Sequence, residues 1–144
     1  MKKKKLKSIK SLQNKAERKW KEYCYLRDGK VCMVKQYAPY LQMLHTDVYQ
    51  VDHCVSRANK HTFLEVANGT VICSACNFAK NLNHKSVARI VDEIVIKREG
   101  IDVYERMVKS DKECGANLNW NKRWWLEEQI EILCHLIEEY KKRR

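Results

Sequence analysis

The sequence is poor in the residues that interrupt regular structure. Its 144 residues include one proline and four glycines, which excludes collagen-like and Gly/Pro-rich low-complexity chains. No run of about 18 apolar residues occurs, so we expect no membrane span, and the basic start MKKKKLKSIK lacks the apolar stretch of a signal peptide. Seven cysteines without an export signal indicate a reducing compartment in which thiols are free or bind metal. We therefore expect a cytoplasmic, single-domain protein.

Positive charge is concentrated at the two ends of the chain. The net charge is +11. Residues 1–22 hold ten basic and two acidic side chains, a net of +8, and residues 141–144 add +4, which leaves −1 for residues 23–140. Basic ends of this kind are typical of arms that bind the phosphates of a nucleic acid, although they also keep a protein soluble. The predicted DNA contacts of the N-terminal arm are Lys2, Lys3, Lys4 and Lys5.

Hydrophobic periodicity predicts helices joined to one short hairpin. The expected helices cover 10–27, 76–81, 86–98 and a final segment from 126 to 140, with a further short helix over 101–109. Two short strands are expected at 48–51 and 70–72, whereas most of 31–50 is expected to be a loop and 110–122 a polar connection.

The final helix carries apolar residues at a heptad spacing of 4, 3, 4 and 3. These residues are Leu126, Ile130, Leu133, Ile137 and Tyr140. Such a seam either packs on the helix's own domain or forms a homodimer through this C-terminal helix.

The most informative residues follow the two predicted strands. Asp52 and His53 end the first strand, where a carboxylate can hold a divalent cation and a neutral imidazole can take a proton from water. That combination suits phosphodiester hydrolysis. Cys73 and Cys76 have the spacing of half a zinc knuckle, and Asn77 would point toward Asp52 and His53 if the strands pair as a hairpin.

Together these residues resemble the motif of the HNH nucleases, whose fold is a ββα hairpin-and-helix metal site. The resemblance is carried by Asp52-His53, Asn68 and Cys73-x-x-Cys76-Asn77-x-x-Lys80, with Asn77 in place of the usual last His. Over residues 20–142 the chain also resembles the phage NinG (Rap) recombination endonucleases. That likeness rests on the segment 23–28, Cys32, His53-x-x-Ser56-Arg57 and the Trp-rich segment before the final helix.

The resemblance implies an α+β fold with a ββα-metal core and flanking helices. The implied regions are a basic arm and helix start (1–22), a nuclease core (23–100) and a helical extension with a basic tail (101–144). His53 would be the general base, and Asp52 and Asn77 would bind one Mg²⁺ or Mn²⁺. Asn68 would hold the loop between the strands. The implied phosphate contacts are Arg57 and Lys80.

A structural zinc is implied as well, but its ligand set is incomplete in the sequence. Cys32, Cys73 and Cys76 supply three thiols, and Lys35 stands where these families have a further cysteine. The fourth ligand would be Cys24, His45 or Cys54, or the site holds no metal.

The implied function is metal-dependent DNA cleavage, on branched recombination intermediates such as Holliday junctions if the NinG likeness holds. Asp52 departs from the NinG pattern, in which the residue before the His tends not to be acidic. The alternatives are an HNH nickase acting on duplex DNA and a zinc-knuckle DNA-binding protein without catalysis. Trp120, Trp124 and Trp125 either stack on unpaired bases or pack the last helix onto the core.

Overall fold

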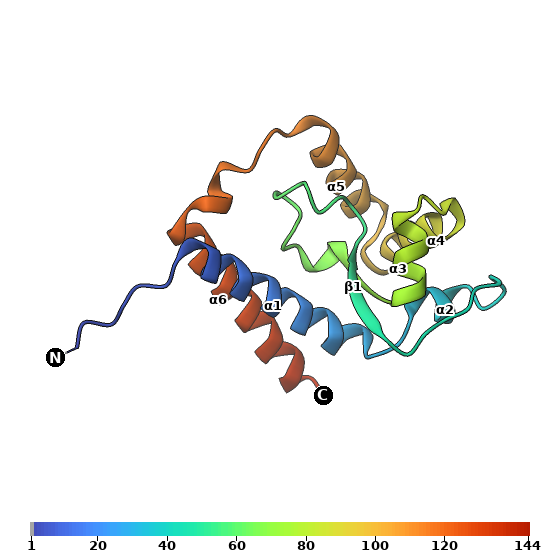
Figure 1. Ribbon diagram of the computed structural model, residues 1–144, viewed down its shortest axis with the longest axis horizontal. Helices are drawn as coiled ribbons and strands as arrows, with labels where there is room; N and C mark the ends of the chain where they lie inside the picture. The colour runs from blue at the N-terminus through green and yellow to red at the C-terminus, as the bar shows by residue number, and fades with distance from the viewer. Residues whose placement is uncertain (1) are drawn as a thin grey trace.

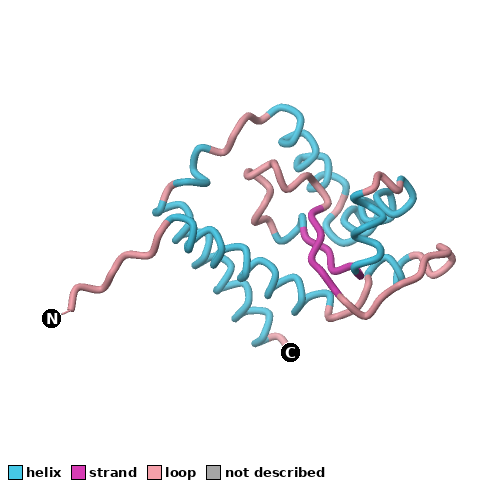
Figure 2. Tube along the Cα trace, viewed as in Figure 1, coloured by secondary structure: helices cyan, strands magenta, loops and turns pink. Residues whose placement is uncertain are grey.

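The computed structural model describes residues 2–144 as an α+β protein that is mostly helical, with one two-stranded antiparallel sheet (Figures 1 and 2). In chain order the elements are α1 (Ile9–Asp28), α2 (Met33–Tyr37), β1 (Tyr49–His53), the 3₁₀ turn η1 (Val66–Asn68), β2 (Gly69–Cys73), α3 (Ser74–Asn81), α4 (Lys85–Glu99), α5 (Ile101–Glu113), the 3₁₀ turn η2 (Leu118–Asn121) and α6 (Arg123–Lys142). Among these residues no helix is both long and apolar enough to cross a membrane.

Helices α1 and α6 lie side by side and run in the same direction (Figure 1). At their starts Arg123 donates to the backbone carbonyl of Lys7, and at their ends the Lys141 ammonium is 3.9 Å from the Glu22 carboxylate. The apolar face of α1 meets that of α6 in a core that also receives residues of the hairpin and of the loop between its strands. The regions 1–22, 23–100 and 101–144 each contribute residues to this cluster, and two further clusters lie around α4.

The heptad residues of α6 are used within the chain. Leu126, Ile130, Leu133 and Ile137 are all buried. A homodimer through α6 would have to use the other face of the helix.

The hairpin and the helix after it form a continuous ββα unit. Strands β1 and β2 pair antiparallel with Asp52 opposite Thr70 and His53 opposite Gly69, and α3 begins directly after β2. Because successive side chains of a strand point to opposite faces, Asp52 and His53 face different sides of the hairpin. His53 faces α1, whereas Asp52 faces α3.

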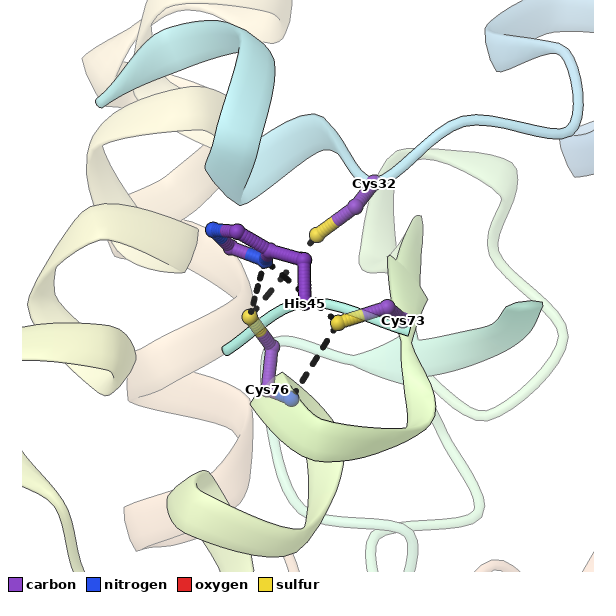
Figure 3. A group of neighbouring side chains, drawn as sticks. All are labelled: Cys32, His45, Cys73 and Cys76. Atoms are coloured by element: carbon purple, nitrogen blue, oxygen red, sulfur yellow. Dashed lines mark hydrogen bonds between the residues drawn. The ribbon is translucent and has the colours of Figure 1, made fainter. Parts of the chain in front are cut away.

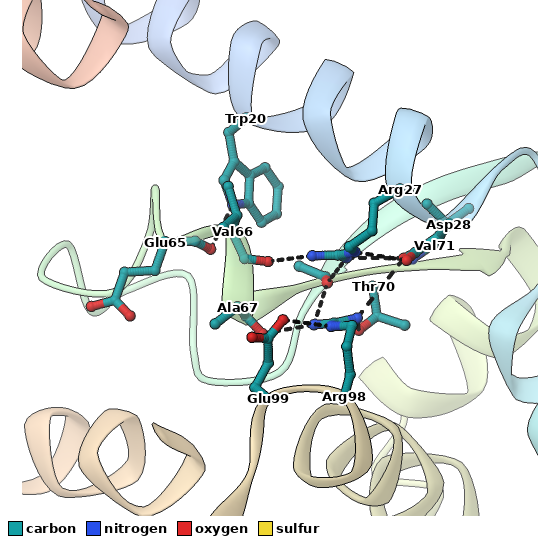
Figure 4. A network of polar contacts seen from close by, with 11 residues as sticks. Trp20, Arg27, Asp28, Glu65, Val66, Ala67, Thr70, Val71, Arg98 and Glu99 are labelled. Atoms are coloured by element: carbon teal, nitrogen blue, oxygen red, sulfur yellow. Dashed lines mark hydrogen bonds and ion pairs between the residues drawn. The ribbon is translucent and has the colours of Figure 1, made fainter. Parts of the chain in front are cut away.

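The outer edge of β2 is covered by charged side chains rather than by a third strand (Figure 4). The Asp28 carboxylate accepts a hydrogen bond from the Val71 amide at 3.1 Å. Arg27 and Arg98 both donate to the Gly69 carbonyl, at 2.5 and 3.0 Å. Asp28 also pairs with Arg27 at 2.7 Å. These contacts satisfy backbone groups that an open sheet edge leaves unpaired.

Substitution of Asp28 by asparagine is expected to destabilise the protein by about 3 kcal/mol, because it leaves two largely buried guanidinium groups without their shared anion. For a chain of this length the loss corresponds to a fall in melting temperature of about 10 °C. Thermal unfolding followed by circular dichroism measures it. The matched control is Asp111→Asn on the exposed surface of α5, and equal melting of the two variants would contradict the role of Asp28.

Two helices differ from the sequence prediction. The segment 33–37, expected as loop, forms the short helix α2, whose Val34 is fully buried; a helix of five residues is too short for a 3.6-residue period to be recognised. Helix α5 continues to Glu113 instead of ending at 109, with Met107 fully buried. The polar character of residues 110–113 reflects solvent exposure rather than the end of the helix.

Candidate functional site

Three thiols and one imidazole converge where α2, β2 and α3 meet (Figure 3). Cys32 immediately precedes α2, His45 lies in the loop before β1, Cys73 ends β2 and Cys76 lies in the first turn of α3. Their potential ligand atoms all lie within 4.8 Å of one another. The Cys73 thiol also accepts a hydrogen bond from the Cys76 amide at 3.4 Å and so caps α3.

The distances in this Cys₃His cluster fit a tetrahedral zinc ion. With Zn–S bonds of about 2.3 Å and Zn–N bonds of about 2.05 Å, tetrahedral geometry requires separations of about 3.8 Å between sulfurs and about 3.6 Å between sulfur and nitrogen. The Cys32 and Cys76 sulfurs are 3.7 Å apart, and His45 Nδ1 lies 3.4 Å from the Cys76 sulfur and 3.5 Å from that of Cys73. The cluster is therefore compatible with a structural zinc.

The fourth member of the cluster is His45, one of three candidates left open by the sequence. Cys24 is buried against Trp20 and the hairpin instead, and burial raises the pKa of its thiol to about 11. The Cys54 thiol lies 3.1 Å from the Asp92 carboxylate. Within the cluster, the hydrogen bond between the Cys32 and Cys76 thiols lowers the pKa of Cys32, which favours a thiolate there.

His53 packs against two aromatic rings. Its ring centroid lies 4.2 Å from that of Trp20 and 4.5 Å from that of Phe63, with both pairs stacked. Its Nε2 lies 3.0 Å from the Phe63 carbonyl oxygen. Because a carbonyl oxygen only accepts, Nε2 carries the proton and Nδ1 is the basic nitrogen. The sequence indicated Trp20 as a core residue of α1, but nothing in it indicated Phe63.

The basic nitrogen of His53 is accessible and uncharged. Nδ1 has no hydrogen-bond partner among residues 2–144. In this part of the chain every fully buried side-chain nitrogen has a partner, so Nδ1 is not fully buried. Nδ1 therefore keeps some contact with solvent, although His53 as a whole is only 4% exposed. Burial, with a smaller contribution from the nearby Arg57 cation, lowers the pKa of His53 to about 4. The imidazole is therefore neutral at pH 7, the state in which it can accept a proton.

A polar pocket of about 320 Å³ lies beside His53. The pocket brings together side chains of α1, β1, α3 and the loop after β1. Its lining residues are Glu17, Lys21, Tyr25, Gln50, Val51, His53, Arg57 and Asn77. His53, Arg57 and Asn77, which the sequence singled out, thus share one pocket, whereas Glu17, Lys21, Tyr25 and Gln50 were not identified from the sequence.

Asp52 and Asn77 are held by side chains on the α3 face of the hairpin. Lys80 donates to one carboxylate oxygen of Asp52 at 2.6 Å and to the His53 carbonyl at 2.7 Å. The Asn77 amide nitrogen donates to the side chain of Gln50. Burial raises the pKa of Asp52, and the Lys80 charge opposes this shift. Lys80 is directed at the strand rather than outward toward a phosphate.

Asn68 fastens the loop between the two strands. Its side chain is fully buried, accepts from the Val55 amide at 2.7 Å and donates to the carbonyls of Val55 and Thr62 at 3.2 and 3.1 Å. These bonds fix both ends of the loop segment that carries Arg57. The amide is thus a structural support rather than a group facing the pocket.

The remaining predicted contacts are spread over the surface. Lys2, Lys3, Lys4 and Lys5 are exposed in a segment that extends away from the body of the protein (Figure 1). Trp120 and Trp125 are partly buried against the core, whereas Trp124 is 59% exposed. Core packing thus accounts for two of the three tryptophans.

Comparison with protein-family models, with curated protein sequences and with solved structures found no match to this chain.

Proposed function

We propose that this protein is a metal-dependent DNA endonuclease of the HNH type. The observation that supports the proposal is the state of His53: a neutral imidazole, fixed by a carbonyl and two rings, that lines a polar pocket. The ββα arrangement around it places Asn77 and Arg57 at the same pocket. A positioned neutral base beside oxygen donors and a guanidinium suits hydrolysis of a phosphodiester.

In this proposal His53 takes the proton of the attacking water at Nδ1. The imidazolium that results keeps its Nε2–H bond to the Phe63 carbonyl and lies against the faces of Trp20 and Phe63. Aromatic faces attract a cation, which offsets part of the cost that burial imposes on the charged form. Arg57, at the rim of the pocket, is placed to contact a phosphate oxygen.

The proposed ligands of a catalytic Mg²⁺ or Mn²⁺ are Asn77, which lines the pocket of His53, and the neighbouring Asp52, which does not line it. Lys80 uses one carboxylate oxygen of Asp52, and Gln50 uses the amide nitrogen of Asn77. One carboxylate oxygen and the amide oxygen are therefore left as hard ligands, a small set of the kind that Mg²⁺ completes with water and substrate. When bound, the cation would neutralise charge on the scissile phosphate and on the leaving oxygen.

We propose further that the Cys₃His cluster binds zinc in a structural role. Its ligands are buried or half-buried and lie away from the pocket of His53, and four protein ligands leave no open position for substrate. The cluster also supports the alternative of a zinc-containing DNA-binding protein without catalysis. The accessible base at His53 favours the nuclease, since DNA binding alone has no need of one.

Cleavage of a labelled four-way junction and of a linear duplex of the same sequence tests the proposal. Because a chelator would also strip zinc, the catalytic metal is varied by adding Mg²⁺ or Mn²⁺ to zinc-loaded protein in chelator-free buffer. We expect cleavage only with added metal, and preference for the junction if the likeness to recombination nucleases holds. Equal cleavage of the junction and the linear duplex would support a nuclease that has no preference for junctions. Binding without cleavage under all conditions would leave the DNA-binding alternative.

A further inference from the structure

A second group of cationic side chains lies beside the pocket, around Lys60. The Lys60 ammonium is 3.8 Å from the ring centroid of Phe63 and 4.9 Å from that of Trp120. The Arg57 guanidinium is 5.8 Å from the Phe63 centroid, and Lys10 of α1 contributes to the same positive field. The two rings hold the ammonium in place without neutralising it.

This group has more positive than negative charge. Among residues 2–144 Lys60 makes no ion pair, and the one carboxylate at this end of the pocket, Glu17, lies 3.4 Å from both Arg57 and Lys21. Four cations, with Lys10 as the fourth, thus share one anion. The pKa of Lys60 is lowered, first by burial and then by the Arg57 charge. An anion bound here would relieve both effects.

The position of Lys60 relates it directly to His53. The His53 ring is stacked on Phe63 at 4.5 Å, and Lys60 lies over the same ring at 3.8 Å. Because His53 already covers one face of Phe63, the ammonium occupies the other. One aromatic ring therefore separates Lys60 from His53. At this separation Lys60 can contact the phosphate next to the scissile one when the scissile phosphate lies at His53.

We propose that Lys60, together with Arg57 and Lys10, binds a DNA backbone phosphate that flanks the scissile one. This inference rests on the proposed function, since it takes His53 to mark the cleavage point. Lys10 lies in the first turn of α1, directly after the segment that carries Lys2 to Lys5. The phosphate site thus continues into the basic arm, and the DNA strand runs from the pocket along the start of α1.

Equilibrium binding of a fluorescein-labelled DNA duplex tests the inference in Mg²⁺-free buffer, where the proposed reaction does not run. The variant is Lys60→Met, which keeps an unbranched side chain over the two rings and removes the charge. Loss of one phosphate contact is expected to weaken binding about eightfold at 0.1 M salt and to reduce the slope of log K against log salt by about 0.9. Lys60→Arg is expected to restore both values.

The matched control is Lys97→Met, which removes a lysine whose ammonium lies 5.5 Å from the ring of Tyr37, outside the group described here. We expect its affinity and salt slope to equal those of the parent. A parent-like salt slope in Lys60→Met would overturn the phosphate site even if the protein cleaves DNA. A reduced slope in a protein that never cleaves would support the phosphate site while the nuclease proposal fails. If Lys60→Met weakened the binding of an RNA duplex more than the binding of the DNA duplex, the assignment to DNA would be overturned.

Discussion

Removal of zinc is expected to lower the free energy of unfolding by about 10 kcal/mol, the lower end of the range for structural zinc. That amount is comparable with the whole stability of a domain. The cluster joins separate parts of the chain. His45 belongs to the loop before β1, and Cys73 and Cys76 lie at the start of α3. Without metal, these elements lose their common attachment.

Thermal unfolding with and without chelator, and of Cys76→Ala, measures this effect, together with the zinc content of the purified protein. We expect one zinc per chain in the parent and none in the variant. The control is Cys114→Ala, which removes an exposed cysteine outside the cluster and should change neither quantity. A parent protein that contains no zinc and melts at the same temperature with chelator would contradict the zinc site. Because α3 carries Asn77, loss of zinc is also expected to abolish cleavage.

The sequence predicted the parts of the fold that local periodicity encodes. Leu12, Ala16 and Trp20, spaced four residues apart, face the core as expected for an amphipathic helix. The two short strands do pair as a hairpin. Its antiparallel register and the helix that follows bring His53 and Asn77 to one pocket although 24 positions separate them in the chain.

The sequence could not predict the contacts that depend on the path of a loop or on which face of a strand a residue occupies. His45 joins the cysteines because an irregular loop returns to them, and no local pattern specifies that path. Asp28, which follows the expected helix 10–27, accepts a hydrogen bond from the edge of β2, a contact that no local pattern indicates. Lys80, expected as a phosphate contact, pairs with Asp52, since both face the side of the hairpin that α3 covers.

His53→Ala is expected to reduce the cleavage rate by about 10³-fold, within the range that general-base catalysis supplies. The loss follows from the removal of Nδ1, the solvent-accessible ring nitrogen proposed to accept the proton of water. The variant should still bind the duplex, because the phosphate contacts lie on other side chains. Single-turnover cleavage with Mg²⁺ measures the rate, and His135→Ala, which removes an exposed histidine of α6, is the matched control.

Chemical rescue separates catalysis from folding in this variant. Truncation of His53 leaves a ring-sized gap beside Trp20 and Phe63, whose rings are stacked against the imidazole. Free imidazole is expected to enter this gap, donate its N–H to the Phe63 carbonyl and restore part of the rate in proportion to its unprotonated concentration. A structural role alone would give no such dependence. A parent-like rate in His53→Ala would contradict the assignment of His53 as the base, because no other histidine lines this pocket.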